Sequence, residues 1–392
     1  MRYFLIGLQF LLSGINFLNA QEKAFSTEGW WEPEGEKFSP VVHEDRSITF
    51  RLNAPQADNV TLLFGEWDIV EKKMKKDDLG NWSINLKNVE SGIYQYNFLI
   101  NNSFKKLDPV NPNIKVGTNI YGSIVEVPDT PARFDQLQEV PHGEVHIITY
   151  RSIVLDKTRK MYVYVPKIYQ ELKDVKFPVL YLRHGGGDNE GSWINDGRAN
   201  IILDNLISQG KSKPMLIVMS NGLIDGSWSS GSTIEGMNTL EEELINDIIP
   251  LIENRYHVSK NKKDRAIAGL SMGGGQSVVI GLRNPNLFSF EGDFSAGLLS
   301  DPDIDLSTYW IETINDDGTR RISPLDAVDF DPACSGTDCN NGFLHSKIIQ
   351  SNWDSIYHCE SDTLVYEDDD CGGACSGNCN EIPQPGRFLV LS

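Results

Sequence analysis

The feature that most constrains this chain is a short strand-like run, residues 265–268, that leads into the turn Gly269-Leu270-Ser271-Met272-Gly273. Small residues follow and favour the start of a helix. Such a turn needs glycines around its serine because the backbone is strained and packs against both strand and helix. A bare Gly-x-Ser-x-Gly pattern is weak evidence by itself. The strand before it and the helix start after it favour its interpretation as a nucleophile elbow, with Ser271 as nucleophile. The alternative is a tight structural turn.

A second glycine-rich turn, residues 183–188, directly follows the apolar run 177–182. Backbone N–H groups of such a turn can point at a developing oxyanion, together with the N–H of Met272. We expect Gly185 or Gly186 to be the partner donor. His184 is expected to shape this loop, because hydrolases of this kind take their catalytic base from after the serine.

From about residue 140 the pattern alternates between strands and helical segments, which predicts an α/β fold with a mostly parallel sheet. The runs 177–182 and 215–219 are nearly all apolar, as expected of strands buried on both faces. Residues 239–255 have helical spacing. Thr239 and Glu242 predict a capping box at its start, and Pro250 predicts a kink.

The front of the chain has a different pattern. Residues 47–98 contain short alternating runs broken by turn residues, which predict a small all-β sandwich. Residues 108–113 cannot form a regular strand because repeated prolines remove ladder donors. With 392 residues, two domains are expected. We place the sandwich at 21–135, a linker near 128–140, and the α/β-hydrolase domain at 140–392.

Residues 1–20 have the layout of a secretory signal peptide: Arg2, an apolar run at 3–12, and Ala20 at the cleavage position. The run is too short for a membrane anchor. The mature protein is therefore predicted to be secreted, extracellular or periplasmic, without integral membrane association. The alternative is a buried N-terminal helix.

The cysteines are confined to the last 60 residues, and an even number in an exported chain favours disulfides. The alternative is a zinc site formed by the closely spaced Cys371, Cys375 and Cys379. The six cysteines are Cys334, Cys339, Cys359, Cys371, Cys375 and Cys379. A formal charge of -20 argues against a nucleic-acid partner, whose phosphates are bound by basic residues. Nothing in the sequence points to a cofactor or fixes the oligomeric state.

Residues 140–300 resemble the esterase family that includes feruloyl and acetylxylan esterases of carbohydrate esterase family 1, S-formylglutathione hydrolase (esterase D) and the mycolyltransferases. The resemblance lies in segments 140–145, 161–166, 180–193, 244–250 and 265–275. It implies a secreted serine esterase that removes feruloyl or acetyl groups from plant polysaccharide through an acyl-enzyme. Trp193, within the matching segment 180–193, is the candidate substrate-binding residue.

Residues 40–127 resemble the immunoglobulin-like module that often precedes such esterases and is similar to family 48 carbohydrate-binding modules. The matching pieces are 49–55, 80–83, 92–96 and 108–109. This resemblance implies a carbohydrate partner. Trp67 and Trp82 are candidates for stacking on sugar, although aromatic residues on strands are more often core.

The expected triad is incomplete in the sequence. A serine needs a histidine to accept its proton and an acid to orient that histidine. The family's order is serine, acid, histidine, but its Gly-Gly-His segment and Gly-x-Asp-like turn are absent. We name His358 over His345 as base, because it lies 87 residues after Ser271, a separation like that in the family. The acid candidates are Asp326, Asp329 and Asp331, which the sequence does not rank, and we name Asp329. From about residue 331 the composition changes, which indicates a divergent cap or a truncated or frame-shifted reading.

Three functions remain open at this stage. The first is ester hydrolysis on an acylated carbohydrate or a small ester. The second is carbohydrate binding by a protein with an impaired esterase domain, since the triad pattern is incomplete. The third is acyl transfer to a sugar from the same nucleophile.

Overall fold

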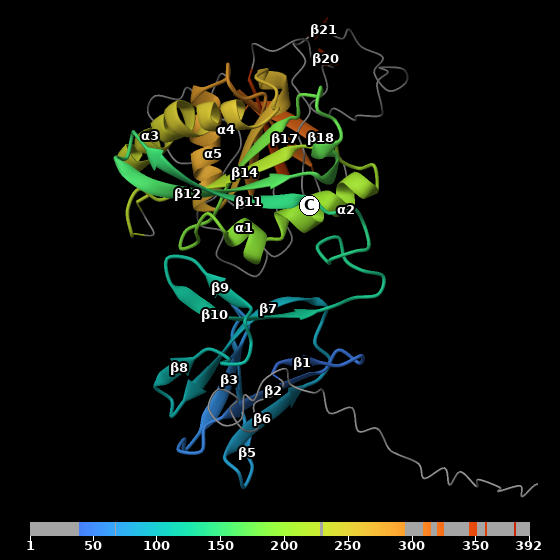
Figure 1. Ribbon diagram of the computed structural model, residues 1–392, viewed down its shortest axis with the longest axis vertical. Coiled ribbons are helices and arrows are strands. Elements are labelled where there is room, and N and C mark those ends of the chain that lie inside the picture. Colours follow the sequence, from blue (N-terminus) through green and yellow to red (C-terminus); the bar gives the residue numbers. More distant parts are fainter. Residues whose placement is uncertain are drawn as a thin grey trace, which may run out of the picture.

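The computed structural model describes residues 39–66, 68–227 and 230–294, together with the backbone of five short strands further along the chain. A β-sandwich lies at one end of the molecule and an α/β domain at the other, and the β9–β10 hairpin of the sandwich points toward α1 of the α/β domain (Figure 1). The two domains therefore meet at this hairpin.

The front domain contains two antiparallel sheets. One has the order β1-β2-β6-β5, with β1 (Val41–Val42), β2 (Ile48–Asn53), β6 (Asn81–Leu86) and β5 (Lys75–Lys76). The other has the order β4-β3-β7-β10-β9, with β8 also paired to β7; its strands are β3 (Val60–Phe64), β4 (Val70–Lys73), β7 (Gly92–Ile100), β8 (Phe104–Lys106), β9 (Ile114–Val116) and β10 (Ile120–Val127). The predicted β-sandwich is confirmed.

The core of the sandwich follows from the period-two alternation of its strands. On β2, Ile48, Phe50 and Leu52 alternate with half-buried residues and are fully buried. A buried carboxylate also ties the sheets together: Asp108 accepts hydrogen bonds from Ser39 Oγ at 2.6 Å and Tyr96 Oη at 2.8 Å. Burial raises the pKa of Asp108.

Trp82 belongs to this core, so the sugar-stacking role suggested for it is wrong. Its side chain is only 6% exposed, and its Nε1 donates to the Ala54 carbonyl at 3.0 Å. The Lys76 ammonium lies 5.4 Å from the ring centroid. The ring therefore has no free face for a sugar. Trp67 lies outside the described residues.

The second domain is built on a six-stranded mixed sheet of order β11-β12-β14-β13-β15-β16. The strands are β11 (Glu144–Ser152), β12 (Lys157–Val165), β13 (Val179–Arg183), β14 (Leu216–Ser220), β15 (Arg265–Leu270) and β16 (Phe290–Phe294). Strands β14, β13, β15 and β16 run parallel, whereas β12 is antiparallel to its neighbours β11 and β14. This arrangement confirms the predicted α/β class.

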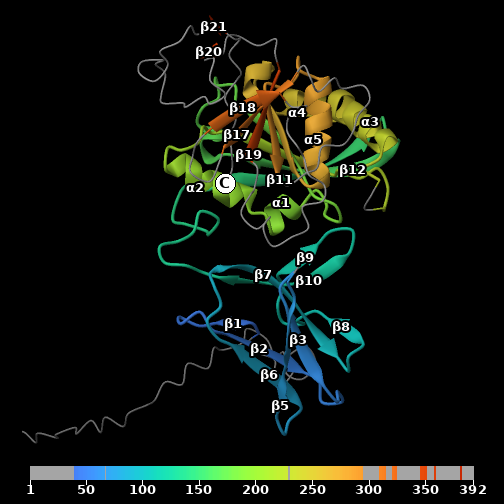
Figure 2. The same ribbon diagram turned by 180° about the vertical axis from the view of Figure 1, so that it is seen from behind.

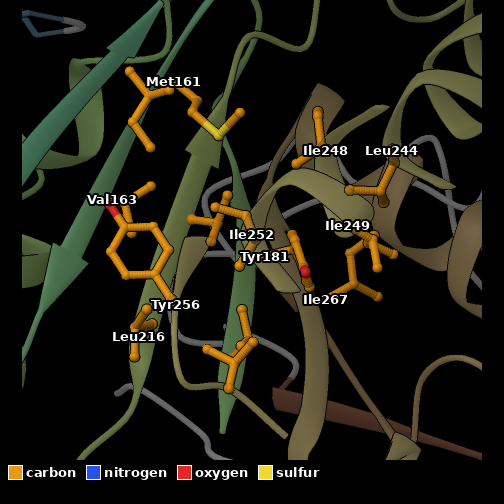
Figure 3. Close-up of a cluster of buried hydrophobic side chains, with 14 of the residues drawn as sticks. Met161, Val163, Tyr181, Leu216, Leu244, Ile248, Ile249, Ile252, Tyr256 and Ile267 are labelled. Carbon is orange, nitrogen blue, oxygen red and sulfur yellow. The ribbon is translucent and has the colours of Figure 1, made fainter. Parts of the chain in front are cut away.

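Helices cover both faces of this sheet (Figures 1 and 2). One face carries α1 (Ser192–Asn195) and α2 (Ala199–Ser208). The other carries α3 (Ile234–Glu243), η2 (Leu244–Ile248), α4 (Ile249–Arg255) and α5 (Met272–Arg283). Short 3-10 turns lie at η1 (Lys167–Gln170) and η3 (Lys262–Asp264). Figure 3 shows residues of η2 and α4, such as Ile248 and Ile252, packing on sheet residues such as Met161 and Ile267.

The predicted capping box at Thr239 is wrong. Helix α3 begins at Ile234, five residues before Thr239. Thr233 is its N-cap, with Oγ1 accepting the Gly236 N–H at 3.0 Å. Thr239 lies inside the helix, where its hydroxyl donates to the Glu235 carbonyl. The first turn of α3 has few apolar residues, so the apolar pattern placed the start too late.

The irregularity expected at Pro250 takes the form of a π-helical turn. Segment η2 (Leu244–Ile248) joins α3 to α4, and Pro250 stands in the first turn of α4. Proline has no N–H to donate to the preceding turn, so the regular helical hydrogen-bond ladder cannot continue through it.

Further along the chain, β17 (Tyr309–Ile314), β18 (Arg320–Pro324) and β19 (His345–Gln350) form a separate antiparallel sheet. Strand β20 (Tyr357–His358) pairs with β21 (Asn380–Glu381). The cysteine side chains and residues 1–20 lie outside the described residues, so the disulfides and the signal peptide stay predictions. Within the described part, no helix is long and apolar enough to cross a membrane, and no group of ligand side chains could hold a metal ion.

The packing in Figure 3 predicts a large stability effect at one position. Ile252 of α4 is fully buried against the sheet, so Ile252→Ala should lower the free energy of unfolding by about 2–5 kcal/mol. Ile153 is 81% exposed, and Ile153→Ala serves as the matched control with a change below about 0.5 kcal/mol. Urea unfolding followed by circular dichroism measures both; equal midpoints for the two variants would contradict the packing.

Candidate active site

Ser271 lies between the end of β15 and the start of α5, and its side chain is exposed. Its backbone has φ 51° and ψ −113°, an unfavourable conformation for a residue with a side chain. The flanking glycines permit this turn. A Cβ on Gly273 would lie 2.5 Å from the His184 carbonyl oxygen, and one on Gly269 would overlap the backbone of Gly273. The strand, strained turn and helix thus have the geometry of a nucleophile elbow.

The glycine loop lies directly beside this turn. The Cβ position of Gly185 is 3.6 Å from the Leu270 carbonyl oxygen, so the loop and the elbow are neighbours. The N–H groups of Gly185 and Gly186 donate to no atom in the described part of the chain. Met272 is the first residue of α5, where the amide has no intrahelical acceptor. These three amides are therefore available to an oxyanion near Ser271.

His184 is a structural residue of this loop. It is 2% exposed, its Nδ1 donates to the Gly185 carbonyl at 2.8 Å, and its Nε2 accepts the Gly222 N–H at 2.8 Å. Burial lowers the pKa of His184 to about 4, so the ring is neutral. Because both ring nitrogens are occupied, His184 has no free nitrogen to take a proton from Ser271.

A cavity of about 230 Å³ opens beside the loop, with walls from both domains. Trp193 forms part of the wall, and its Nε1 donates to the Arg183 carbonyl at 2.9 Å, which fixes the ring. The cavity is lined by Glu66, Ile93, Tyr94, Gln95, Lys115 and Ile124 of the sandwich and by His184, Gly185, Asp188, Ser192, Trp193, Asp196, Gly197 and Leu270 of the α/β domain.

The polar part of the cavity is an ionic cluster across the domain boundary. Lys115 Nζ lies 2.7 Å from Glu66 Oε1 and 3.6 Å from Asp196 Oδ2. Burial raises the pKa of Asp196 to about 6 and also raises that of Asp188. Burial opposes the charge of Lys115, but the neighbouring carboxylates outweigh it and raise the Lys115 pKa. The cluster thus offers several donors and acceptors to a polar ligand.

The structure brings together some of the residues named from the sequence. Gly185 lies beside the elbow that holds Ser271 and Met272, Gly186 is the next residue of the same loop, and Trp193 lies in the adjoining cavity wall. Asp329 and the side chain of His358 lie outside the described residues, so acid and base stay predictions.

Sequence reasoning missed the contribution of the sandwich, above all Lys115 and Glu66. No local pattern marks these residues, because their role depends on where the two domains touch.

The buried His184 predicts a pH-dependent stability. Its folded pKa of about 4 lies below the ordinary value of 6.5, so between these values the unfolded chain binds a proton that the folded chain does not. Stability should therefore fall as the pH drops from 6.5 toward 4, by up to about 3 kcal/mol from this group. Above pH 6.5 both states are neutral and the effect vanishes.

The measurement compares the wild-type chain with His184→Gln, which keeps a donor and an acceptor but does not titrate. The difference between their free energies of unfolding should change across this pH range. A constant difference from pH 4 to pH 8 would contradict the assignment of a neutral buried ring.

Comparison with known proteins matches two family models in this chain. Residues 152–326 match the family model described as "Putative esterase", and residues 37–113 match carbohydrate-binding module 48, the isoamylase N-terminal domain. The chain is 33% identical over 285 residues to an endo-1,4-beta-xylanase/feruloyl esterase of Xylanibacter ruminicola, covering 71% of this chain and 37% of that protein. It is 29% identical over 156 residues to endo-1,4-beta-xylanase Y of Acetivibrio thermocellus, covering 37% of this chain and 13% of that protein.

Among solved structures, a CE1 ferulic acid esterase from Anaeromyces mucronatus in complex with ferulic acid is 30% identical, with a TM-score of 0.38. The match covers 44% of this chain and 64% of that one. The chain spans 37% or less of the length of the two curated relatives. Residues 152–326 thus have the sequence pattern of the esterase family model, and they follow a region that matches the model of carbohydrate-binding module 48.

Proposed function

We propose that this chain is a secreted serine esterase that hydrolyses acyl esters, with feruloyl or acetyl groups on plant polysaccharide as its substrates. The observation that carries the proposal is the exposed Ser271 in a strained elbow beside the glycine loop. The substrate class is supported by the similarity to an endo-1,4-beta-xylanase/feruloyl esterase, and export by the signal-peptide pattern of residues 1–20.

In the first half-reaction, Ser271 Oγ attacks the ester carbonyl carbon and its proton passes to a histidine base, for which His358 is our candidate and Asp329 the orienting acid. The carbonyl oxygen becomes an oxyanion held by the N–H groups of Met272 and of Gly185 or Gly186. Collapse of this intermediate breaks the bond to the alcohol, which leaves with the proton. Water then attacks the acyl-enzyme and releases the carboxylic acid.

The lining of the cavity favours a bulky, partly polar ester as substrate. Trp193 offers an aromatic surface for a planar acyl group, since offset rings attract each other. Lys115, Glu66 and Asp196 offer charged hydrogen-bonding groups for sugar hydroxyls on the other side. One site can thus bind both parts of a feruloylated sugar.

The nucleophile is tested with p-nitrophenyl acetate. Ser271→Ala should lower kcat by at least about 1,000-fold, because oxyanion donors alone retain only a small part of the rate. The exposed Ser103→Ala, in the sandwich, is the matched control and should keep the wild-type rate. A fluorophosphonate probe should label the wild type and Ser103→Ala but not Ser271→Ala. Equal hydrolysis by all three would remove the proposal.

The role of Trp193 is tested by comparing two acyl groups. Trp193→Leu keeps an apolar side chain but loses the ring, so the KM for p-nitrophenyl ferulate should rise about five- to tenfold. The KM for p-nitrophenyl acetate, which has no ring to stack, should change less than twofold. Equal changes for both esters would show that Trp193 supports the loop without contacting the acyl group.

A further inference from the structure

The glycine loop is held from outside its own domain. The Gly187 carbonyl oxygen accepts the Thr118 N–H at 2.7 Å, and it lies 2.9 Å from Tyr121 Oη and 3.1 Å from Thr118 Oγ1. The two hydroxyls are also 2.9 Å apart. Thr118 and Tyr121 belong to the sandwich, at the turn between β9 and β10 and at the start of β10. We call residues 116–121 the clamp hairpin and residues 185–188 the oxyanion loop.

The fit between the clamp hairpin and the oxyanion loop is tight. A Cβ on Gly117 would overlap the Gly187 carbonyl oxygen and would lie 3.0 Å from Asp188 Cα. Asn189, just after the loop, directs its Nδ2 at the carbonyl oxygens of Val116 and Gly117, at 3.3 and 3.4 Å. The hairpin therefore contacts the loop and the residue that follows it.

Two ion pairs between the domains flank this contact along the chain. Lys115, one residue before the clamp hairpin, is paired with Asp196 of the α/β domain at 3.6 Å. Further along β10, Glu126 accepts a hydrogen bond from Arg198 at 2.8 Å. With side-chain exposures of 16–32%, these two pairs are partly shielded from water. They restrict sliding of the hairpin across the loop.

A loop of three glycines needs such support. Glycine has the greatest backbone freedom, and Gly187 adopts φ +84°, which a residue with a side chain rarely adopts. Within its own domain the loop is held mainly at Gly185, whose carbonyl accepts from His184 Nδ1 at 2.8 Å and from the Asp188 N–H at 3.2 Å. Oxyanion donors stabilise developing charge only when they are fixed in advance.

We propose that Thr118 and Tyr121 of the sandwich are positioning residues for the oxyanion hole, acting through the Gly187 carbonyl. The sandwich is then part of the catalytic centre and not only a carbohydrate-binding region. This inference rests on the proposed esterase function, because it assigns a role to the donors Gly185 and Gly186.

The test uses the full chain with p-nitrophenyl acetate, a substrate too small to need sugar contacts. Tyr121→Phe removes one hydrogen bond to Gly187 and should lower kcat about threefold to tenfold with KM within twofold. Gly117→Ala places a methyl group against the loop and should lower kcat by more than about tenfold. Matched controls are Tyr169→Phe, whose hydroxyl accepts the distant His257 N–H, and Gly226→Ala, where a Cβ meets nothing within 4 Å. Both controls should keep the wild-type kcat.

Hydrogen–deuterium exchange gives a readout that does not depend on turnover. The Asp188 amide, which donates to the Gly185 carbonyl, and the Thr118 amide, which donates to the Gly187 carbonyl, should exchange faster in both clamp variants than in the controls. Amides of the buried strand β13 should stay protected. Since Gly117→Ala can also weaken folding, Tyr121→Phe with an unchanged melting temperature keeps the test decisive.

The outcomes separate the two proposals. An active wild type with unchanged kcat in both clamp variants, or unchanged exchange of the Asp188 and Thr118 amides, overturns the clamp and leaves the esterase assignment intact. A fall in kcat without a change in KM, together with faster loop exchange, supports the clamp. Wild-type chain without Ser271-dependent hydrolysis overturns the proposed function, and with it the catalytic role of the clamp.

Discussion

The site depends on one close contact, between the first turn of α5 and the end of β13. Gly273 packs against the carbonyl groups of Arg183 and His184, with no space for a side chain. Behind it, the fully buried Arg183 donates through Nε to Gln276 Oε1 at 2.6 Å. This contact sets the distance between helix α5, which begins directly after Ser271, and the oxyanion loop with the Gly185 and Gly186 amides. A strained serine and a flexible glycine loop are thereby held in one arrangement.

Features encoded over short stretches of sequence were predictable. The elbow at Ser271 and the buried strands β13 and β14 follow from local patterns, because neighbouring residues determine them. The structural role of His184 followed from the chain order of catalytic residues in such hydrolases. One error arose where two local signals compete. Thr239 has the chemistry of an N-cap, but Thr233 satisfies the same requirement earlier in the chain. At Trp82 the two alternatives were core and sugar stacking; the core position, which the sequence favoured, is confirmed by the alternation of β6.

The part of the site that sequence reasoning missed lies between the domains. Lys115 meets Asp196 and Tyr121 meets Gly187 across long separations in sequence, and no spacing rule relates such residues. The location of Asp196 at the domain boundary also affects its pKa. Burial raises the pKa of Asp196, and Lys115 of the sandwich opposes that shift, so this pKa depends on both domains. For the acid and base, Asp329 rests on the family's order of residues, and His358 rests on that order and on its separation from Ser271.

The absence of a side chain at residue 117 also limits how this architecture can diversify. Domains of one chain are commonly joined by a flexible linker, with few contacts across the boundary. Here a transplanted module would have to bring a hairpin with the same bare backbone at the point of contact, since even one methyl group collides with Gly187. Transfer of the sandwich to another protein by recombination, in nature or in the laboratory, should therefore succeed when the α/β domain is transferred with it.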